Sequence, residues 1–213
     1  MRLLRPAALA LLVLAGSAGP SGEGLAQTPT GRSGISNGDL LGNMRAFREL
    51  QAFGICFARA DRRDALDLIA TAPGSPEESQ VFRRPVYREQ ESCGFGGSQF
   101  SLSNIYFRGA IAEGLLRSGG VPESYRLSAP APSETRNLHD VARCYASGHR
   151  AQVQALLETE PGSQPEVAAV AALWNDFRVC MPGFRVRLNA PWIRYLLAEA
   201  LLRLPPEATP PGG

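Results

Sequence analysis

The sequence predicts an all-α protein made of two tandem four-helix repeats, each closed by one internal disulfide. Three observations support this prediction. Residues 50–117 align with residues 138–203 once two single-residue gaps are placed in the second segment. Neither segment shows sustained alternation of apolar and polar residues, which favours helices over strands. Each segment also contains two cysteines at nearly the same spacing. Internal self-similarity of this kind indicates a repeated structural unit.

The positions shared by the two segments cluster at cysteines, turns and helix ends. Cys56-Phe57-Ala58 matches Cys144-Tyr145-Ala146, the Thr-x-Pro-Gly-Ser motif of 71–75 matches 159–163, Cys93 matches Cys180, and the Arg-x-x-x-Ala-Glu-x-Leu-Leu-Arg motif of 108–117 matches 194–203. Residues of these types direct folding more often than chemistry.

Residues 1–26 have the features of an export signal: two early arginines, an apolar run over 7–15 and small residues after it. Cleavage after Ala26 is preferred, and cleavage after Ala18 is the alternative. The apolar run is too short to span a bilayer as a permanent helix. The sequence therefore predicts a periplasmic or secreted protein without a transmembrane segment.

The remaining chain divides into five segments. We expect a flexible leader over 27–35, a first helical repeat over 36–118, a linker over 119–133 that is rich in Gly and Pro, a second helical repeat over 134–204 and a disordered tail over 205–213.

Apolar periodicity predicts the helices in order. The first begins near Ser36 or Asn37, and its apolar face consists of Leu40, Met44, Phe47, Leu50, Phe53 and Phe57. A second helix covers 62–72 and ends at the Pro-Gly pair that follows. A third helix comes next, and the fourth covers 103–118 in the first repeat and 190–204 in the second.

Each third helix should begin with a capping box. Ser75 and Glu78 in the first repeat correspond to Ser163 and Glu166 in the second. In this motif the Ser oxygen accepts a hydrogen bond from the amide of the Glu, while the carboxylate reaches back to the amide of the N-cap residue. Because both copies carry the motif, we interpret these glutamates as structural and not catalytic.

Four cysteines in an exported chain predict two disulfides. Three connectivities are possible. The repeat favours Cys56–Cys93 and Cys144–Cys180, because these bridges close both copies in the same way. The alternatives are a zinc site, which lacks the C-x-x-C spacing, and a reactive thiol, which lacks an activating base. No metal site is predicted.

Arg108 and Arg194 lie on the apolar stripes of the fourth helices. A buried arginine needs partners, but the glutamate five residues later lies about 140° around the same helix. Those glutamates instead suit (i, i+4) pairs, Glu113–Arg117 and Glu199–Arg203. We expect the two stripe arginines to bind backbone carbonyls at the end of the second helix, or the capping glutamate. The alternative is an anion-binding arginine in a pocket.

Composition and motifs give little support for an enzyme. With 22 basic against 20 acidic residues, the net charge of +2 gives no reason to expect a nucleic-acid partner. The motifs G-x-S-x-G, H-E-x-x-H and the P-loop are absent. His139 is expected at the surface or at a helix end, and His149 in a solvated turn. No catalytic residue and no cofactor are predicted.

Residues found in only one repeat are the better candidates for function. The first repeat carries a basic and aromatic segment over 81–88, where Arg83, Arg84 and Tyr87 form a possible protein interface. The second repeat carries Trp174, Phe177, Phe184, Arg185, Arg187 and Trp192.

The repeated pattern C-[FY]-A … T-x-P-G-S-x-x-E … C … R-x-x-x-A-E-x-L-L-R resembles that of uncharacterised exported proteins of GC-rich proteobacteria. This resemblance covers nearly the whole chain after the signal. It implies export and duplication, and it brings no catalytic residue or ligand with it.

These observations predict a non-enzymatic binding or interaction module whose partner is another protein or a component of the cell envelope. The first alternative is a cell-envelope hydrolase with acidic residues in a groove between the repeats. The second is a disulfide-stabilised, chaperone-like stress protein. A binding module should expose an apolar or aromatic patch, whereas an enzyme should show a pocket with convergent ionisable groups.

Overall fold

The structure is a computed structural model that describes residues 44–81, 92–94, 104–122, 125, 127, 137–184, 186 and 188–205. Its helices are α1 (Met44–Ala60), α2 (Arg62–Ala70), α4 (Asn104–Arg117), α5 (Leu138–Gly148), α6 (Arg150–Glu158), α7 (Gln164–Val179) and α8 (Ala190–Arg203). Residues 76–81 are also helical. These ranges contain no strand, so the all-α prediction is confirmed for them. The predicted signal and leader, most of the linker and most of the tail lie outside them.

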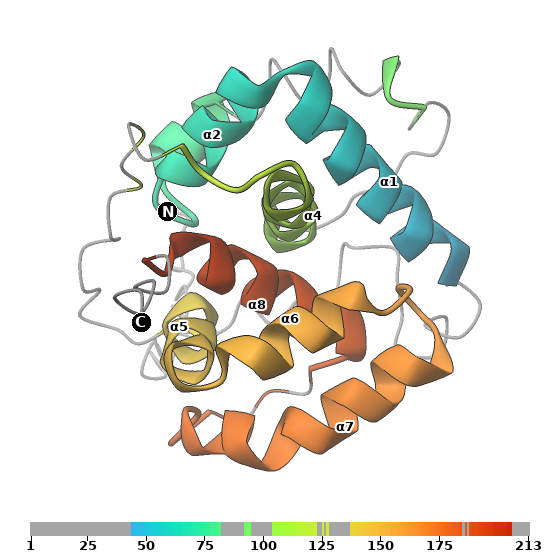
Figure 1. The fold of residues 1–213 in the computed structure, drawn as a ribbon. Coiled ribbons are helices and arrows are strands. Elements are labelled where there is room, and N and C mark those ends of the chain that lie inside the picture. The colour runs from blue at the N-terminus through green and yellow to red at the C-terminus, as the bar shows by residue number, and fades with distance from the viewer. Residues whose placement is uncertain are drawn as a thin grey trace, which may run out of the picture.

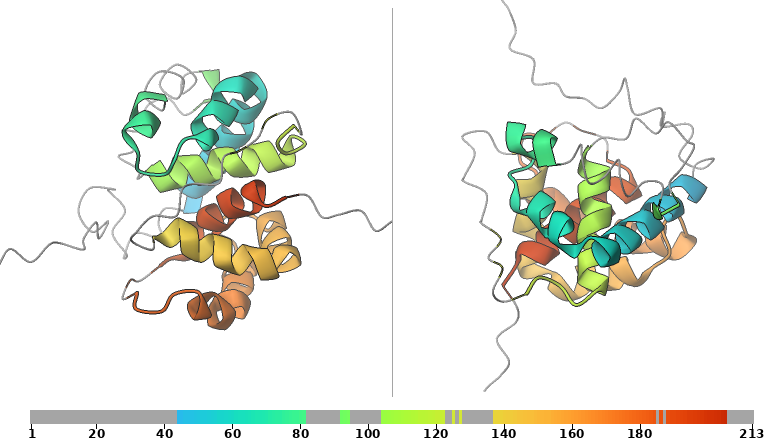
Figure 2. Two further views of the ribbon diagram at one scale, coloured as in Figure 1. Left: turned by 90° about the vertical axis from the view of Figure 1, so that its left-hand side faces the viewer. Right: turned by 90° about the horizontal axis from the view of Figure 1, so that it is seen from above.

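Helices α4 and α8 lie at the centre of the molecule and pack against each other (Figure 1). In the side view, α1 and α2 cover the far side of α4, while α5, α6 and α7 cover the far side of α8 (Figure 2). One continuous apolar core runs through both halves. The two most buried helices, α4 and α8, therefore carry the contact between the halves.

Most helix boundaries agree with the sequence. Helix α4 is one residue shorter at each end than the expected span 103–118. Helix α8 is one residue shorter at its C-terminus than the expected span 190–204. The second helix, expected to reach residue 72, ends at Ala70, because Thr71 is extended (φ −67°, ψ 152°) and its hydroxyl caps the Leu68 carbonyl. The expected start of the first helix near residue 36 lies outside the described residues.

Both disulfides have the predicted connectivity. Cys56 of α1 is bonded to Cys93, and Cys144 of α5 is bonded to Cys180, which is the C-cap of α7. The corresponding Cα–Cα distances are 5.6 and 5.9 Å. No free cysteine remains, so the reactive-thiol alternative is wrong.

Glycines let α1 and α4 cross at close range. A Cβ on Gly54 would lie 2.1 Å from the Ala110 carbonyl oxygen, and a Cβ on Gly114 would lie 2.1 Å from the Gly54 carbonyl oxygen. The two backbones therefore touch with no side chain between them. Bulkier aromatic side chains, including Phe53 and Phe107 in an edge-to-face contact, pack beside the crossing.

Replacing Gly54 with Ala should destabilise the protein by about 1–3 kcal/mol, the usual cost of overpacking a core. Helix propensity alone would act in the opposite direction, since Ala is favoured over Gly by about 1 kcal/mol in a helix interior. Urea unfolding of the variant measures which effect is larger. The control is Gly148→Ala in α5, where a new Cβ meets nothing within 4 Å. If both variants are equally stable, the helices do not cross as closely as described.

Candidate functional site

Arg108 is a fully buried charged residue of the first half, at 0% exposure in α4. Its Nη1 donates to the Leu68 carbonyl (3.0 Å) and the Thr71 hydroxyl (2.9 Å). Its Nη2 donates to the carbonyls of Ile69 (3.3 Å) and Thr71 (3.1 Å). The last carbonyls of a helix have no partner within that helix. Arg108 therefore caps the C-terminus of α2, one of the two kinds of partner expected from the sequence.

The capping glutamate supplies the other expected partner. Arg108 Nη1 also donates to Glu78 Oε1 (3.2 Å), and the Glu78 amide donates to the Ser75 hydroxyl (3.1 Å). The capping-box prediction had the second carboxylate oxygen accept from the amide of the N-cap residue Ser75, and this part of the prediction is wrong. This oxygen accepts from the amide of Gly74, one residue earlier (2.7 Å). This geometry turns the other oxygen towards the arginine.

A third partner of Arg108 comes from the other half of the molecule. Nε and Nη2 donate to the two carboxylate oxygens of Glu199 on α8, at 3.1 and 2.5 Å. This is the bidentate arrangement that makes guanidinium–carboxylate pairs strong. All three guanidinium nitrogens are thus engaged by the protein itself, so Arg108 is not an anion-binding group facing a pocket.

The second half contains an equivalent network, in which the arginine comes from α8 and the glutamate of the opposite half comes from α4. Arg194 of α8 donates to the carbonyls of Leu156, Leu157 and Thr159, to the Thr159 hydroxyl, to Glu166 and, through Nε and Nη2, to Glu113 of α4. Glu166 again accepts from the preceding glycine amide, that of Gly162 (2.6 Å), and not from the amide of the N-cap residue Ser163. Each half therefore supplies the carboxylate that binds the buried arginine of the other half in a bidentate pair.

A second arginine completes each network. Arg117 pairs with Glu113 and Arg203 pairs with Glu199, which are the (i, i+4) contacts expected from the sequence. Burial raises the pKa of the Glu199 carboxyl, but the charge and hydrogen bonds of Arg108 outweigh it and lower that pKa to about 2. Burial likewise lowers the pKa of Arg108, and the carboxylates around it raise that pKa above its usual value. Arg108 and Glu199 therefore form an ion pair near neutral pH.

The interface between the halves is closely packed where the structure describes it. A Cβ on Gly109 of α4 would lie 2.1 Å from the Cβ of Tyr195 on α8. Tyr195 is 1% exposed and its hydroxyl donates to the Phe47 carbonyl. The acidic residues at this interface, Glu113 and Glu199, are both paired with arginines.

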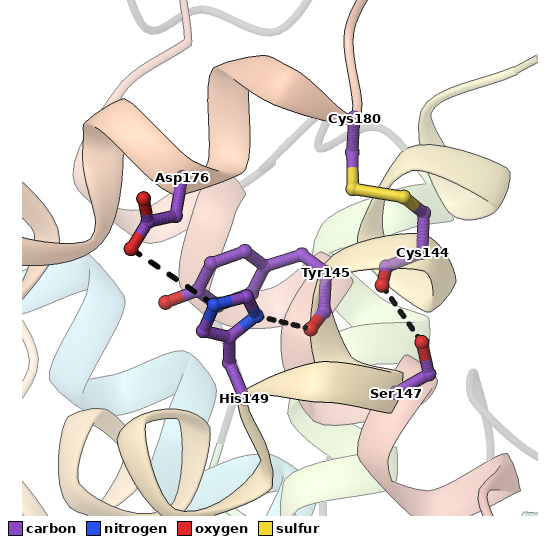
Figure 3. Close-up of a disulfide and its surroundings, with 6 residues drawn as sticks. All are labelled: Cys144, Tyr145, Ser147, His149, Asp176 and Cys180. Carbon is purple, nitrogen blue, oxygen red and sulfur yellow. Dashed lines mark hydrogen bonds and ion pairs between the residues drawn. A yellow bond between two sulfur atoms is a disulfide. The ribbon is translucent and has the colours of Figure 1, made fainter.

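The two histidines have different surroundings. His139 lies in the first turn of α5, as the helix-end prediction holds, but its side chain is only 17% exposed and its Nδ1 lies 3.5 Å from Glu199 Oε2. His149 follows α5, and its ring lies flat on Tyr145, with centroids 4.3 Å apart (Figure 3). Its Nδ1 is 3.0 Å from the Tyr145 carbonyl, and its Nε2 is 3.9 Å from Asp176.

The structure describes a hollow of about 380 Å³ where α7 ends and the chain turns back towards α8. Among the described residues its lining is mostly apolar and includes the cation Arg178: Trp174, Arg178, Met181, Pro182, Gly183, Phe184 and Val186. Gly183, in the turn between the two walls, has a φ of 85°, a backbone conformation that favours glycine. Trp174 and Phe184 belong to the residues that only the second half carries.

Stacked aromatic rings support the wall formed by Trp174. Trp174 stacks on Phe177 with centroids 6.2 Å apart, and Phe177 meets Tyr145 edge to face at 5.6 Å. Tyr145 in turn carries His149, and the neighbouring Cys144–Cys180 disulfide fixes the end of α7 to α5 (Figure 3). The hollow is therefore built on a rigid base.

The outer surface of α7 leads towards this hollow and lacks charge over two turns. Residues 167–174 read Val-Ala-Ala-Val-Ala-Ala-Leu-Trp. Val167 is 48% exposed, and Val179 at the end of the helix is 78% exposed. A surface helix with apolar residues on its outward side indicates an interaction surface.

Other predicted site residues cannot be placed. Arg83, Arg84 and Tyr87 of the possible interface lie outside the described residues, as do Arg185 and Arg187. The described residues contain no group of three or more His, Cys, Asp or Glu that could hold a metal ion.

Sequence reasoning missed the hollow and the exchange of glutamates, in which Glu113 and Glu199 each pair with the buried arginine of the opposite half. Nothing in the sequence shows that Phe184 and Val186 lie opposite Trp174 of α7. The exchange had one signal: each glutamate lies about 140° around its helix from the arginine, which directs the two side chains to different neighbours.

A comparison with protein-family models finds no match, and no curated protein and no solved structure shows significant similarity to the chain.

Proposed function

We propose that the chain is an exported binding module and that the hollow at the end of α7 is its binding site. The observation that carries the proposal is the described lining of the hollow, which combines Trp174 and Phe184 with the cation Arg178. Aromatic and arginine side chains supply most of the binding energy in protein interfaces. The ligand that fits is an apolar or aromatic side chain with a carboxylate beside it, on a protein or envelope component.

The positive charge of Arg178 is the reason for the acidic group in the proposed ligand. Arg178 is exposed in the last turn of α7, and none of the ion pairs among the described residues uses it. Asp176, the nearest acidic residue in sequence, lies beside His149 instead (Figure 3). The guanidinium is thus available to a carboxylate from outside.

Export is supported by the two disulfides, which persist in oxidising compartments. In the part of the chain that is described, no helix has the length and apolarity needed to cross a membrane. A signal over 1–26 and a family of duplicated exported proteins remain predictions. Duplication is supported by the equivalent arginine networks of the two halves.

The test uses the oxidised chain and a matched pair of probes, N-acetyl-Phe-Glu-amide and N-acetyl-Phe-Gln-amide. NMR titration should show binding that perturbs Trp174, with a preference of about two- to fivefold for the Glu probe, the range of an exposed ion pair. Arg178→Gln should remove this preference. Trp174→Leu should weaken binding of both probes by about tenfold or more.

The control variant is Arg45→Gln, which changes an exposed arginine on α1, far from the hollow in sequence and in the other half. It should bind both probes as the parent does. If neither probe perturbs the Trp174 resonance at millimolar concentration, or if Arg178→Gln keeps the preference, the hollow is not a site for this ligand.

A further inference from the structure

The two buried networks differ at one titratable position. Gln51 of α1 donates to Glu113 Oε1 (2.5 Å) in one network. In the other, His139 of α5 lies at the corresponding place in the repeat, with Nδ1 3.5 Å from Glu199 Oε2. The partners of the two glutamates otherwise correspond: a stripe arginine from the opposite half and an arginine four residues further on. One network thus has an uncharged amide where the other has an imidazole.

We propose that His139 makes the junction between the two halves acid-sensitive, so that its protonation favours release of α5 from α8. The Gln51 network serves as a built-in reference, because it holds the same charges in the same geometry and has no group that titrates between pH 5 and 7 at the corresponding position.

The charges around His139 come from each element that packs on it. Glu199 and Arg203 face it from α8, Arg108 from α4 and Glu78 from the helical residues 76–81. On its own helix, Asp140 and Arg143 pair with each other (2.6 Å). Two arginines and two glutamates balance, so the buried network is neutral while His139 is neutral and acquires a net positive charge when His139 is protonated.

Burial is the main cause that lowers the pKa of His139 below 6.5, assisted by the charges of Arg108 and Arg203 and opposed by Glu199 and Glu78. The unfolded or locally opened chain therefore binds a proton more readily than the folded chain. Stability falls as the pH drops below about 6.5 and levels off below the folded-state pKa. Glu199, with its pKa lowered to about 2, stays ionised throughout this range.

Glu166 also titrates differently in the folded state, but in the opposite sense. Burial raises its pKa, opposed by the Gly162 amide and Arg194. A raised carboxyl pKa stabilises the folded state towards acid, so this effect partly masks that of His139. The quantity to compare is therefore the difference between variant and parent at each pH.

The experiment measures the unfolding equilibrium constant of the oxidised full chain by urea titration at several pH values from 5.0 to 7.5. His139→Gln copies the residue of the other network. Relative to this variant, the unfolding constant of the parent should rise with acid by up to about tenfold per pH unit below pH 6.5, the limit for one proton. The protection factors of the α5 amides against hydrogen exchange should fall with acid in the parent only.

The reciprocal variant, Gln51→His, gives a second test in the same molecule. It should add a second acid-sensitive step that the parent lacks, with lower protection factors for the α1 amides at low pH. The inference is overturned if His139→Gln and the parent show the same pH dependence, or if His139→Gln lowers stability equally at every pH. The latter result would make His139 a packing residue alone.

Discussion

Replacing Arg194 with Met is expected to lower the free energy of unfolding by about 3–5 kcal/mol, the cost of leaving buried charges without their partner. The side chain is fully buried, and its removal strands Glu113 and Glu166 together with the last carbonyls of α6. Methionine keeps most of the volume, so cavity formation adds little. Chemical denaturation followed by circular dichroism measures the loss.

A double-mutant cycle tests whether the loss comes from the contact between the halves. Glu113→Gln combined with Arg194→Met should cost less than the two single changes together, with a coupling of about 1–3 kcal/mol, as is usual for residues in one network. Arg45→Met, in an exposed pair with Glu49, is the control and should change stability by less than about 1 kcal/mol. Additive single changes would show that the two side chains do not interact across the interface.

Removing the second disulfide by Cys144→Ala with Cys180→Ala should cost about 3–4 kcal/mol, because the unfolded chain regains the freedom of a loop of 36 residues. Binding at the hollow should weaken as well. Cys180 is the C-cap of α7, and the residues that form the opposite wall of the hollow follow it directly. Urea unfolding and titration with N-acetyl-Phe-Glu-amide report the two effects separately.

The first disulfide provides the matched comparison. Cys56→Ala with Cys93→Ala opens a loop of nearly the same length, 37 residues, and should cost about the same stability. Because this bridge lies in the other half, affinity for the probe should not change. Equal loss of affinity in both double variants would mean that the disulfide acts on the hollow only through global stability.

The fold was largely predictable because its determinants are local or repeated. Apolar periodicity located α4 and α8, and equal cysteine spacing selected the correct disulfides from three possibilities. The partners of Arg108 in its own half were also predictable, since an apolar stripe, an exposed helix end and a capping glutamate restrict where a guanidinium can bind.

The remaining features depend on how the halves meet, which no periodicity encodes. Glu199 was expected to pair only with Arg203, but it also pairs with Arg108 across the contact of α4 with α8, where Gly109 lets Tyr195 approach closely. His139 was expected at the surface or at a helix end, and it does lie in the first turn of α5, but its side chain is largely buried beside Glu199 of α8. The hollow depends on a turn at Gly183, where φ is 85°.

The exchange of glutamates also determines how the chain can be divided. A single half, separated from the other, would keep the pair between its buried arginine and its capping glutamate and its (i, i+4) pair. It would lose the bidentate carboxylate of its arginine and the opposite arginine of its helical glutamate, which lie on the same face. That face is complementary to itself, so two identical halves could form both bidentate pairs as the two different halves do here. The smallest portion of this protein that completes these pairs is therefore a pair of halves, whether joined in one chain or assembled from two.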